Sequence, residues 1–365
     1  MRILIVDDSI VYRSQIRIAL DGQEGIDYVD STLNGKLALE KLEQGSFDVM
    51  ILDLEMPILS GLDTLREMRK RGFITKVLVF SALSRNGAEA TLQALSLGAD
   101  DFALKPSEGQ VNFDTAPIKI REAILPKLAI LLQSIKEPAV SPRSVDARVE
   151  KATELPTSTV DLSKHRPAVI VIGSSTGGPM ALERIFADLN GFQLRCPILV
   201  TQHMPPVFTA TLASRIEKLT GITCTEAQNF EPLRNRIYVA PGDYHMELKT
   251  HDSRVVLALN QSPPRNSVRP AVDPLFESAA RVFGTSVVGF VLTGMGSDGA
   301  IGAKVIRDQG GSIVIQNRES CVVFGMPGAV FQSKQYDEIL DLESIARRLV
   351  LLATLVDRTV ASPRG

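Results

Sequence analysis

The sequence has few cysteines, no excess of either charge and no long apolar run. Cys196, Cys224 and Cys321 are widely separated and show no C-x-x-C spacing, which argues against both a disulfide framework and a zinc site. Forty lysines and arginines nearly balance 42 aspartates and glutamates, so the charge indicates neither a nucleic-acid partner nor an anionic membrane surface. No apolar stretch reaches the ~18–20 residues of a membrane span, and we expect a cytoplasmic protein without membrane insertion.

The length of the chain and one proline-bearing stretch suggest how it is divided. With 365 residues the chain has room for about two domains of ordinary size. Residues 137–167 contain four prolines among scattered polar and charged residues, without helical or strand periodicity, which is typical of a linker. We therefore expect a first domain over 1–120, with its last helix extending to about 136, and a second domain over 168–360.

The first domain alternates short apolar runs with segments of helical periodicity. The predicted strands are Ile3–Val6, Tyr28–Thr32, Val49–Leu52, Val77–Phe80 and Phe102–Leu104. The predicted helices are Val11–Leu20, Lys36–Glu43, Leu62–Arg69, Ala88–Leu97 and Pro117–Ile135. This order predicts a doubly wound, five-stranded parallel sheet that binds its ligand beyond the carboxyl ends of the strands.

Polar residues follow four of these strands, namely Asp7, Asp8, Asp53, Ser81 and Lys105. Because parallel strands end at one edge of the sheet, we expect these side chains to lie together. Three clustered carboxylates repel one another unless a hard cation such as Mg²⁺ neutralises them. Lys105 and Ser81 could then hold the oxygens of a phosphoryl group carried on Asp53. Each residue alone could be an ordinary loop residue, but the combination of five favours the site.

The motifs around these residues are Val-Asp-Asp-Ser, Leu-Asp-Leu-Glu-Met-Pro and Leu-Lys-Pro. In these motifs residues 1–120 resemble a response-regulator receiver domain. The resemblance implies that a histidine kinase phosphorylates Asp53. It also implies that Asp8, Asp53 and the backbone carbonyl of Glu55 bind Mg²⁺, with Asp7 helping through water.

The same resemblance assigns the residues around the phosphoryl group. It implies that Ser81 and Lys105 contact that group. It also places Phe102 at the aromatic position that receiver domains re-orient together with Ser81 on activation.

The second domain also alternates strands and helices, which predicts another doubly wound α/β domain. The predicted strands are Ala168–Ile172, Ile198–Thr201, Arg236–Ala240, Arg254–Leu259, Val287–Leu292 and Ser312–Ile315. The predicted helices are Met180–Leu189, Val207–Leu219, Pro274–Phe283, Ala300–Asp308 and Leu342–Leu355. A DNA-binding output domain would be a smaller helical module with a basic recognition helix, and this segment is neither.

The turn after its first strand reads Gly-Ser-Ser-Thr-Gly-Gly and places Ser174, Ser175 and Thr176 before a helix. Backbone amides and the helix dipole there favour an oxyanion or a phosphate. The hydroxyls could instead only cap the helix.

A serine in this turn becomes a nucleophile if a base and an orienting carboxylate lie at the same edge. His203 directly follows the second strand of this domain, and Asp298 lies in the glycine-rich loop after the strand that starts at Val287. His245 and His251 are weaker candidates, because one starts a probable hairpin strand and the other lies in a turn.

The glycine-rich loop supports one alternative. Gly294–Gly299 fits the dinucleotide fingerprint G-x-G-x-x-G. It comes late in the domain, however, and the next strand ends in Gln316 and Asn317 rather than in the acid that holds a ribose. The alternative is therefore a receiver joined to a nucleotide-binding domain without hydrolase turnover.

Several longer motifs carry a resemblance over residues 168–355. They are Ile-Gly-Ser-Ser-Thr-Gly-Gly, Thr-Gln-His-Met-Pro-Pro, Val-Ala-Pro-Gly-Asp-Tyr-His-Met, Arg-Pro-Ala-Val-Asp, Leu-Thr-Gly-Met-Gly-Ser-Asp-Gly and Cys-Val-Val-Phe-Gly-Met-Pro. The segment resembles the catalytic domain of the CheB-type chemotaxis protein-glutamate methylesterases. The resemblance implies that Ser175 is the nucleophile, His203 its base and Asp298 the residue that orients the base.

The resemblance further places oxyanion stabilisation at Thr176 and Met295. Ser174 departs from the alanine common at its position and puts a second hydroxyl beside Ser175, so the motif, and not chemistry alone, selects Ser175. The implied activity is hydrolysis of glutamyl γ-methyl esters on methyl-accepting chemoreceptors, with methanol released. Deamidation of receptor glutamines and activation by phosphorylation are also implied. The esterase reaction itself requires no cofactor.

Overall fold

The computed structural model describes residues 1–106, 115–136, 162 and 165–355. The chain divides into two units, Met1–Ser141 and Pro142–Gly365, and each unit has its own sheet. The predicted linker over 137–167 lies almost wholly outside the described residues. None of the described helices is both long and apolar enough to cross a lipid bilayer.

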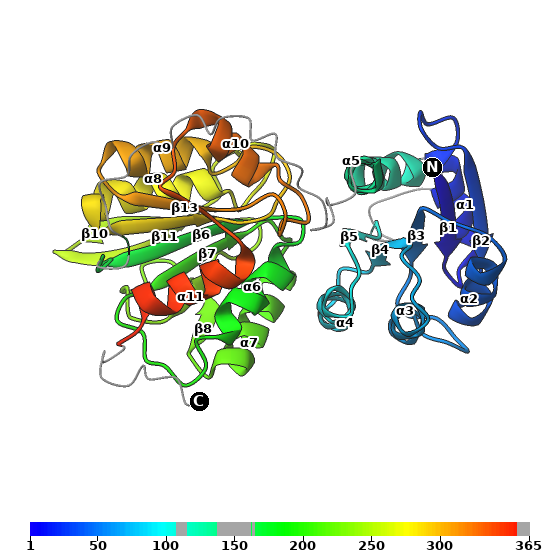
Figure 1. Cartoon of the computed structure of the whole chain (residues 1–365), viewed down its shortest axis with the longest axis horizontal. Helices are drawn as coiled ribbons and strands as arrows, with labels where there is room; N and C mark the ends of the chain where they lie inside the picture. The colour runs from blue at the N-terminus through cyan, green and yellow to red at the C-terminus, as the bar shows by residue number, and fades with distance from the viewer. Residues whose placement is uncertain (107–114, 137–161, 163–164, 356–365) are drawn as a thin grey trace, which may run out of the picture. The chain divides into compact units, whose positions relative to one another are not determined.

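The N-terminal unit is a five-stranded parallel sheet in the order β2-β1-β3-β4-β5. Its strands are β1 (Arg2–Val6), β2 (Tyr28–Thr32), β3 (Val49–Leu52), β4 (Lys76–Ser81) and β5 (Asp101–Leu104). Its helices are α1 (Ile10–Leu20), α2 (Gly35–Gln44), α3 (Gly61–Lys70), α4 (Arg85–Ser96) and α5 (Ala116–Lys136). Helices α1 and α5 cover one face and α2, α3 and α4 the other (Figure 1), which confirms the predicted doubly wound fold.

Four of these helices begin at a polar residue that directly follows the loop after a strand. The side chains of Ser9, Asn34, Ser60 and Ser84 each accept a hydrogen bond from the amide three residues further on. Such caps satisfy one of the amides that have no partner inside the helix. The caps therefore fix where each helix leaves the carboxyl edge of the sheet.

The C-terminal unit is a seven-stranded sheet, parallel throughout, in the order β14-β13-β12-β6-β7-β9-β8. Its strands are β6 (Val169–Ser174), β7 (Ile198–Gln202), β8 (Cys224–Glu226), β9 (Ile237–Val239), β12 (Val287–Val291), β13 (Ser312–Gln316) and β14 (Glu338–Leu340). Its helices are α6 (Gly178–Ala187), α7 (Phe208–Thr220), α8 (Val272–Phe283), α9 (Ala300–Asp308), α10 (Met326–Ser333) and α11 (Leu342–Ala353). Helices α8, α9 and α10 cover one face and α6, α7 and α11 the other (Figure 1). The doubly wound prediction is confirmed here too.

Strand β6 is the point at which the order of this sheet reverses. The chain first adds β7, β8 and β9 on one side of β6 and later returns to place β12, β13 and β14 on the other side. Adjacent loops diverge at such a point and leave a crevice beyond the carboxyl ends of the strands. In this unit the reversal lies between β6 and β12, so the loops that follow these two strands are where a site is expected.

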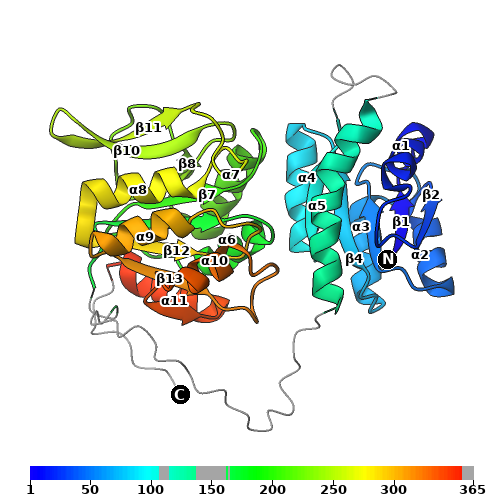
Figure 2. The same ribbon diagram turned by 90° about the horizontal axis from the view of Figure 1, so that it is seen from above.

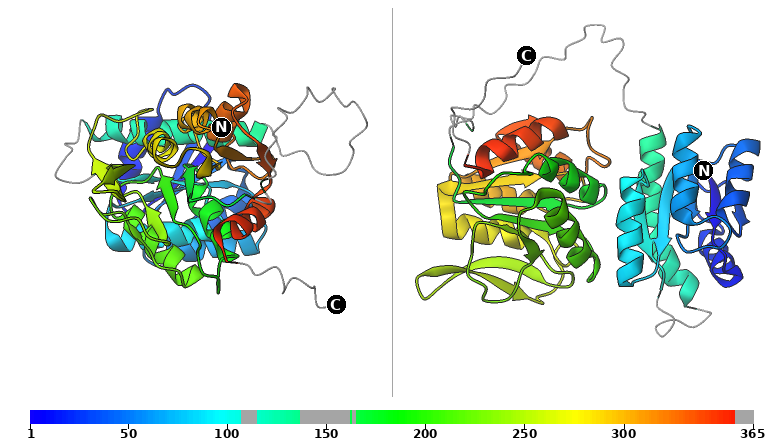
Figure 3. Two further views of the ribbon diagram at one scale, coloured as in Figure 1. Left: turned by 90° about the vertical axis from the view of Figure 1, so that its left-hand side faces the viewer. Right: turned by 90° about the horizontal axis from the view of Figure 1, so that it is seen from below.

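Some elements were not predicted. The strands β8 and β14 have only three residues each, with mainly half-buried side chains, so they contain no apolar run to reveal them. The hairpin strand expected to start at His245 is confirmed: β10 (His245–His251) pairs antiparallel with β11 (Arg254–Asn260), apart from the seven-stranded sheet. Asp252 and Ser253 form its left-handed turn, and the hairpin extends from the side of the unit (Figure 3).

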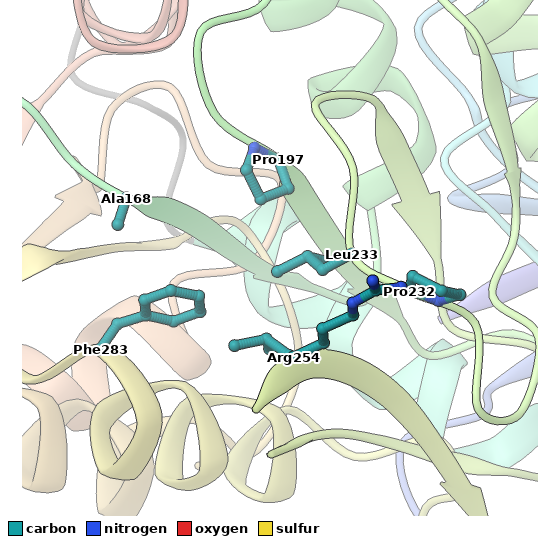
Figure 4. A pocket seen from close by; sticks show the side chains of 7 residues that line it. Ala168, Pro197, Pro232, Leu233, Arg254 and Phe283 are labelled. Carbon is teal, nitrogen blue, oxygen red and sulfur yellow. The ribbon is translucent and has the colours of Figure 1, made fainter. Parts of the chain in front are cut away.

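A cavity of about 380 Å³ lies at the edge of the sheet opposite to the loops that follow β6 and β12. Ala168 and Pro197, which precede β6 and β7, line it together with side chains of the hairpin and of α8 (Figure 4). Its remaining lining residues are Pro232, Leu233, Arg254, Val255 and Phe283. Because it lies at the amino ends of the strands, it is not part of the predicted catalytic cluster.

Helices α8 and α9 run side by side (Figure 2), and Gly302 permits their close packing. A methyl group at Gly302 would lie 2.5 Å from Cβ of Phe276 and 3.2 Å from Cα of Asp273. Replacing glycine by alanine inside a helix is otherwise favourable by about 0.5–1 kcal/mol. Here overpacking outweighs that gain.

We predict that Gly302→Ala lowers the free energy of unfolding by about 1–3 kcal/mol. Urea unfolding followed by circular dichroism measures the change. Ile301→Ala is the control, because Ile301 is exposed on the same helix and its truncation should stay within about 0.5 kcal/mol. An unchanged or higher stability of Gly302→Ala would contradict the packing described here.

Candidate functional site

Ser175 and His203 occupy equivalent positions at the ends of neighbouring strands. The parallel register of β6 and β7 pairs Ser174 with Gln202, so the next residues of the two strands are Ser175 and His203. The His203 amide donates to the carbonyl of Ser174 at 3.1 Å, which continues the ladder by one step. Both residues therefore leave the sheet at the same edge.

The imidazole of His203 contacts the carboxylate of Asp298. Its Nε2 lies 2.8 Å from Oδ2 of Asp298, and both side chains are largely buried. An ionised carboxylate only accepts hydrogen bonds, so Nε2 carries the proton of the neutral ring. Nδ1 is then left as the nitrogen that can accept a proton.

The Asp298 carboxylate is held by four further hydrogen bonds. The donors are the amides of Val272, Asp273 and Gly299, at 2.6, 3.2 and 3.0 Å, and Nδ2 of Asn266 at 3.0 Å. Val272 and Asp273 start α8, whose amino end favours negative charge. Burial opposes ionisation, but His203 and the helix amides outweigh it, so the pKa of Asp298 lies below its ordinary value.

The two adjacent serines differ in environment. Ser174 is fully buried, and its hydroxyl donates to Oε1 of Gln202 at 2.7 Å. Nε2 of Gln202 in turn donates to the carbonyl of Ser175 at 2.9 Å. Ser175 is half-buried, and within the described residues its hydroxyl makes no hydrogen bond. The structure therefore brings Ser175 to the edge occupied by His203 without a hydrogen bond between the two side chains.

The loop after β12 closes over the loop after β6. The amide of Ser175 donates to the carbonyl of Thr293 at 3.0 Å, and the hydroxyl of Thr293 donates to the carbonyl of Thr176 at 3.0 Å. A side chain on Gly294 would lie 2.8 Å from Cβ of Ser175, so only glycine allows this approach. Thr176 follows Ser175 in the same loop and is buried, whereas Met295 lies in the loop after β12 and is half-exposed.

The dinucleotide-binding alternative conflicts with the contacts of the Gly294–Gly299 loop. A pyrophosphate would need the free amides at the start of α9. The Gly299 amide instead donates to the side chains of Asp273 and Asp298, each at 3.0 Å, and the Gly302 amide donates to Asp273 at 2.7 Å. Two carboxylates already occupy the position that a phosphate would take.

Three residues near Asp298 had no role in the predicted site: the buried Asp273 and His245 and the exposed Asn266. Asn266 and Asp273 contact Asp298 directly. His245 donates from Nε2 to the carbonyl of Pro263 and accepts from the amide of Ala271, both at 3.2 Å. Burial lowers the pKa of His245. The acid at the end of the motif Arg-Pro-Ala-Val-Asp was the available signal for Asp273, whereas nothing in the pattern pointed to Asn266.

The N-terminal unit brings its predicted acidic residues together. One carboxylate oxygen from each of Asp7, Asp8 and Asp53 lies within 4.8 Å of the others. Nζ of Lys105 lies 2.9 Å from Oδ2 of Asp7 and 2.9 Å from Oδ2 of Asp53. The ammonium group therefore bridges the two buried acids, while Asp8 is exposed.

The electrostatics of this cluster suit a cation or a phosphoryl group. Burial raises the pKa of Asp53 to about 6; Lys105 lowers it and Asp7 raises it further. Burial disfavours the charge on Lys105, but Asp53 and Asp7 outweigh burial, and the pKa of Lys105 lies above its ordinary value. A divalent cation bound beside Asp53 would stabilise the ionised form of its carboxylate, which burial disfavours.

The other predicted site residues of the N-terminal unit are Ser81, Phe102 and Glu55. The hydroxyl of Ser81 donates to the carbonyl of Gly87, in α4, at 3.3 Å, and the Ser81 carbonyl accepts from the Lys105 amide at 2.8 Å. Phe102 is buried. The residue Glu55 is exposed, and its predicted contribution was the backbone carbonyl alone.

Known proteins match both units. The family model of the response regulator receiver domain matches residues 3–112, and that of the CheB methylesterase matches residues 170–349. The chain is 39% identical over 364 residues to the protein-glutamate methylesterase/protein-glutamine glutaminase 1 of Rhodospirillum rubrum, covering 95% of this chain and 93% of that protein. The protein-glutamate methylesterase/protein-glutamine glutaminase of a Nocardioides species is 39% identical over 363 residues, covering 96% and 95%.

Among solved structures, the crystal structure of the Thermotoga maritima CheB methylesterase catalytic domain has 40% sequence identity to this chain. The match covers 50% of this chain and 97% of that one, with a TM-score of 0.48. The relatives of full length match across both units, so the two predicted resemblances are confirmed together. The chain belongs to the CheB methylesterase family and carries that family's catalytic domain behind a response regulator receiver domain.

Proposed function

We propose that the protein hydrolyses glutamyl γ-methyl esters on methyl-accepting chemoreceptors, releases methanol, and deamidates receptor glutamines. The observation that supports the chemistry most directly is the convergence of Ser175, His203 and Asp298 at the carboxyl ends of β6, β7 and β12. The names of the relatives support the substrate. Phosphorylation of Asp53 by a histidine kinase would control the activity.

The proposed reaction begins with attack of the Ser175 hydroxyl on the ester carbonyl. His203 takes the hydroxyl proton on Nδ1 and then returns it to the departing methoxide, so methanol leaves and a γ-glutamyl ester of Ser175 remains. Water adds to this ester with His203 again acting as base, which regenerates Ser175 and a glutamate. Asp298 holds the ring and stabilises the imidazolium that forms in both steps.

The negative charge on the tetrahedral intermediate needs hydrogen-bond donors close to Ser175. We assign this role to Thr176 and Met295. Among the described residues the Met295 amide has no hydrogen-bond partner, which makes it available to an oxyanion. One donor of this kind accounts for about 10²–10³ in rate in comparable sites.

We predict that Ser175→Ala reduces methanol release from methylated receptors to background, whereas Ser174→Ala keeps substantial activity. The reason is that the hydroxyl of Ser174 is buried and bonded to Gln202. A serine-directed fluorophosphonate should label the wild type and Ser174→Ala but not Ser175→Ala. Labelling of Ser175→Ala with loss of labelling in Ser174→Ala would assign the nucleophile to Ser174 instead.

We predict that Asp298→Asn lowers kcat by up to about 10⁴ with little change in KM, because the role of this carboxylate is to orient and stabilise His203. Single-turnover methanol release at saturating receptor measures the loss. Asp308→Asn is the matched control, since Asp308 is an exposed acid paired with Lys304. Wild-type kcat in Asp298→Asn would remove Asp298 from the reaction.

The acidic cluster of the receiver fits Mg²⁺, because its oxygens are the hard ligands that this ion prefers. Asp8 and Asp53, the carbonyl of Glu55 and, through water, Asp7 would hold the ion. When bound, Mg²⁺ neutralises the charge that develops on the transferring phosphoryl oxygens. Lys105 and Ser81 would contact the phosphoryl group on Asp53, which requires Lys105 to leave its present bridge between two acids.

We predict that a chelator abolishes phosphorylation of Asp53 by a small phosphodonor but leaves the basal esterase rate of the Asp53→Asn protein unchanged. The acidic cluster is the one group of possible metal ligands found in the described residues, and it lies in the receiver. Phosphate incorporation and methanol release are measured with and without added Mg²⁺. A chelator-sensitive esterase rate in Asp53→Asn would contradict a metal-free catalytic domain.

A further inference from the structure

A tight turn precedes α8 and has two residues in the left-handed region. Arg265 and Val268 exchange both backbone hydrogen bonds, at 3.1 and 3.0 Å. Between them Asn266 and Ser267 have φ of 51° and 64°. Asparagine tolerates this region better than most residues. His245 holds the segment on both sides of the turn through its bonds to Pro263 and Ala271.

The turn directs the side chain of Asn266 toward two buried carboxylates. Its Nδ2 donates to Oδ1 of Asp298 at 3.0 Å and to Oδ2 of Asp273 at 3.2 Å. Asp298 is 1% exposed and Asp273 is fully buried. An amide nitrogen has two hydrogens, so Asn266 can satisfy both acids at once.

Each of the two carboxylates also accepts hydrogen bonds from amides at the start of the other's helix. Asp298, which lies before α9, accepts from the amides that start α8. Asp273, which lies in α8, accepts from the amides of Gly299 and Gly302 at the start of α9. Each acid therefore caps the other helix, and the close packing of α8 and α9 (Figure 2) brings the two negative charges together.

We propose that Asn266 is a positioning residue for the triad: by bridging Asp273 and Asp298 it keeps Oδ2 of Asp298 directed at His203. This inference rests on the proposed function, because it assumes that Asp298 acts on His203 during hydrolysis. Oδ1 of Asp298 is occupied by Asn266 and two backbone amides. The carboxylate cannot turn to present Oδ1 to the ring without losing these bonds.

Other charged groups also face the pair. Arg265 lies 3.8 Å from Oδ2 of Asp273 but is held by a double hydrogen bond to Glu277. His203 lies on Oδ2 of Asp298, and His245 lies behind the turn with its pKa lowered by burial. Burial raises the pKa of Asp273 to about 6, with the Gly302 amide opposing and the charge of Asp298 adding to the rise. Because a donor to a carboxylate favours its charged form, loss of the Asn266 amide should raise this pKa further.

The test is Asn266→Gly, which keeps the left-handed backbone accessible and removes only the side chain. We expect kcat for methanol release to fall about tenfold or more with KM within twofold. The acid side of the pH profile should move to higher pH. Ser267→Gly is the matched control, since within the described residues the Ser267 side chain makes no hydrogen bond; it should keep wild-type kcat and pH profile.

A double variant separates positioning from general loss of structure. In an Asp298→Asn background, Asn266→Gly should cause little or no further loss, because its effect passes through the Asp298 carboxylate. An equal fold-loss in both backgrounds, or wild-type kcat and pH profile in Asn266→Gly alone, would overturn the inference and leave the triad intact. Full activity in Asp298→Asn would instead refute the proposed triad itself.

The variant Asn266→Asp covers the case in which Asn266→Gly does not fold. It keeps the shape of the side chain but places a third carboxylate against Asp273 and Asp298. We expect a loss of kcat at pH 8 that is partly recovered toward pH 6.5, as one of the three carboxyl groups takes up a proton. Wild-type kcat at pH 8 in this variant would also overturn the inference.

Discussion

A buried carboxylate needs hydrogen-bond donors to offset the cost of removing its charge from water. In the C-terminal unit the residues around Asp298 are arranged so that its carboxylate has such donors. An isolated charge in a protein interior costs several kcal/mol, and hydrogen bonds to the charged form offset that cost. Asp298 receives five such contacts, from His203, Asn266 and three backbone amides. The helix packing, the glycine at 302 and the turn before α8 all serve to deliver these donors.

The receiver also buries carboxylates, but it neutralises them with a side chain and not mainly with backbone amides. Asp7 and Asp53 are compensated by one ammonium group at the end of a long side chain, and backbone amides contribute less. The ammonium group of Lys105 ends a long side chain with several rotatable bonds, whereas the amides around Asp298 are fixed by two helices. Fixed donors suit the proposed role of Asp298, a carboxylate that stays charged in one orientation. A movable ammonium group suits the proposed role of Asp53, a carboxylate that takes up and loses a phosphoryl group.

The sequence predicts what depends on the carboxyl edge of a parallel sheet. Asp7, Asp53, Ser175 and His203 directly follow strands, so the topology alone places them at the functional edges. Asp298 could be placed because its loop follows the same pattern. The sequence did not predict the parts of the site that depend on loop conformation.

Asn266 lies in a left-handed turn beyond the end of the predicted strand Arg254–Leu259, and no periodicity marks such a position. His245 supports that turn through backbone contacts, which leave no pattern of residue types. Ser174 could not be separated from Ser175 by chemistry alone, because the difference lies in burial and in the hydrogen bond to Gln202.

Asp298 contacts Nε2 of His203, and this determines which ring nitrogen carries the proton in the neutral ring. In the Ser-His-Asp arrangement of other serine hydrolases the carboxylate holds Nδ1, and it selects a ring form that free histidine does not favour in water. Here the carboxylate holds Nε2, and the ring form it selects is the one that free histidine already prefers. In the proposed reaction, Asp298 would therefore serve less to choose between tautomers than to keep the ring in place and to stabilise its positive charge.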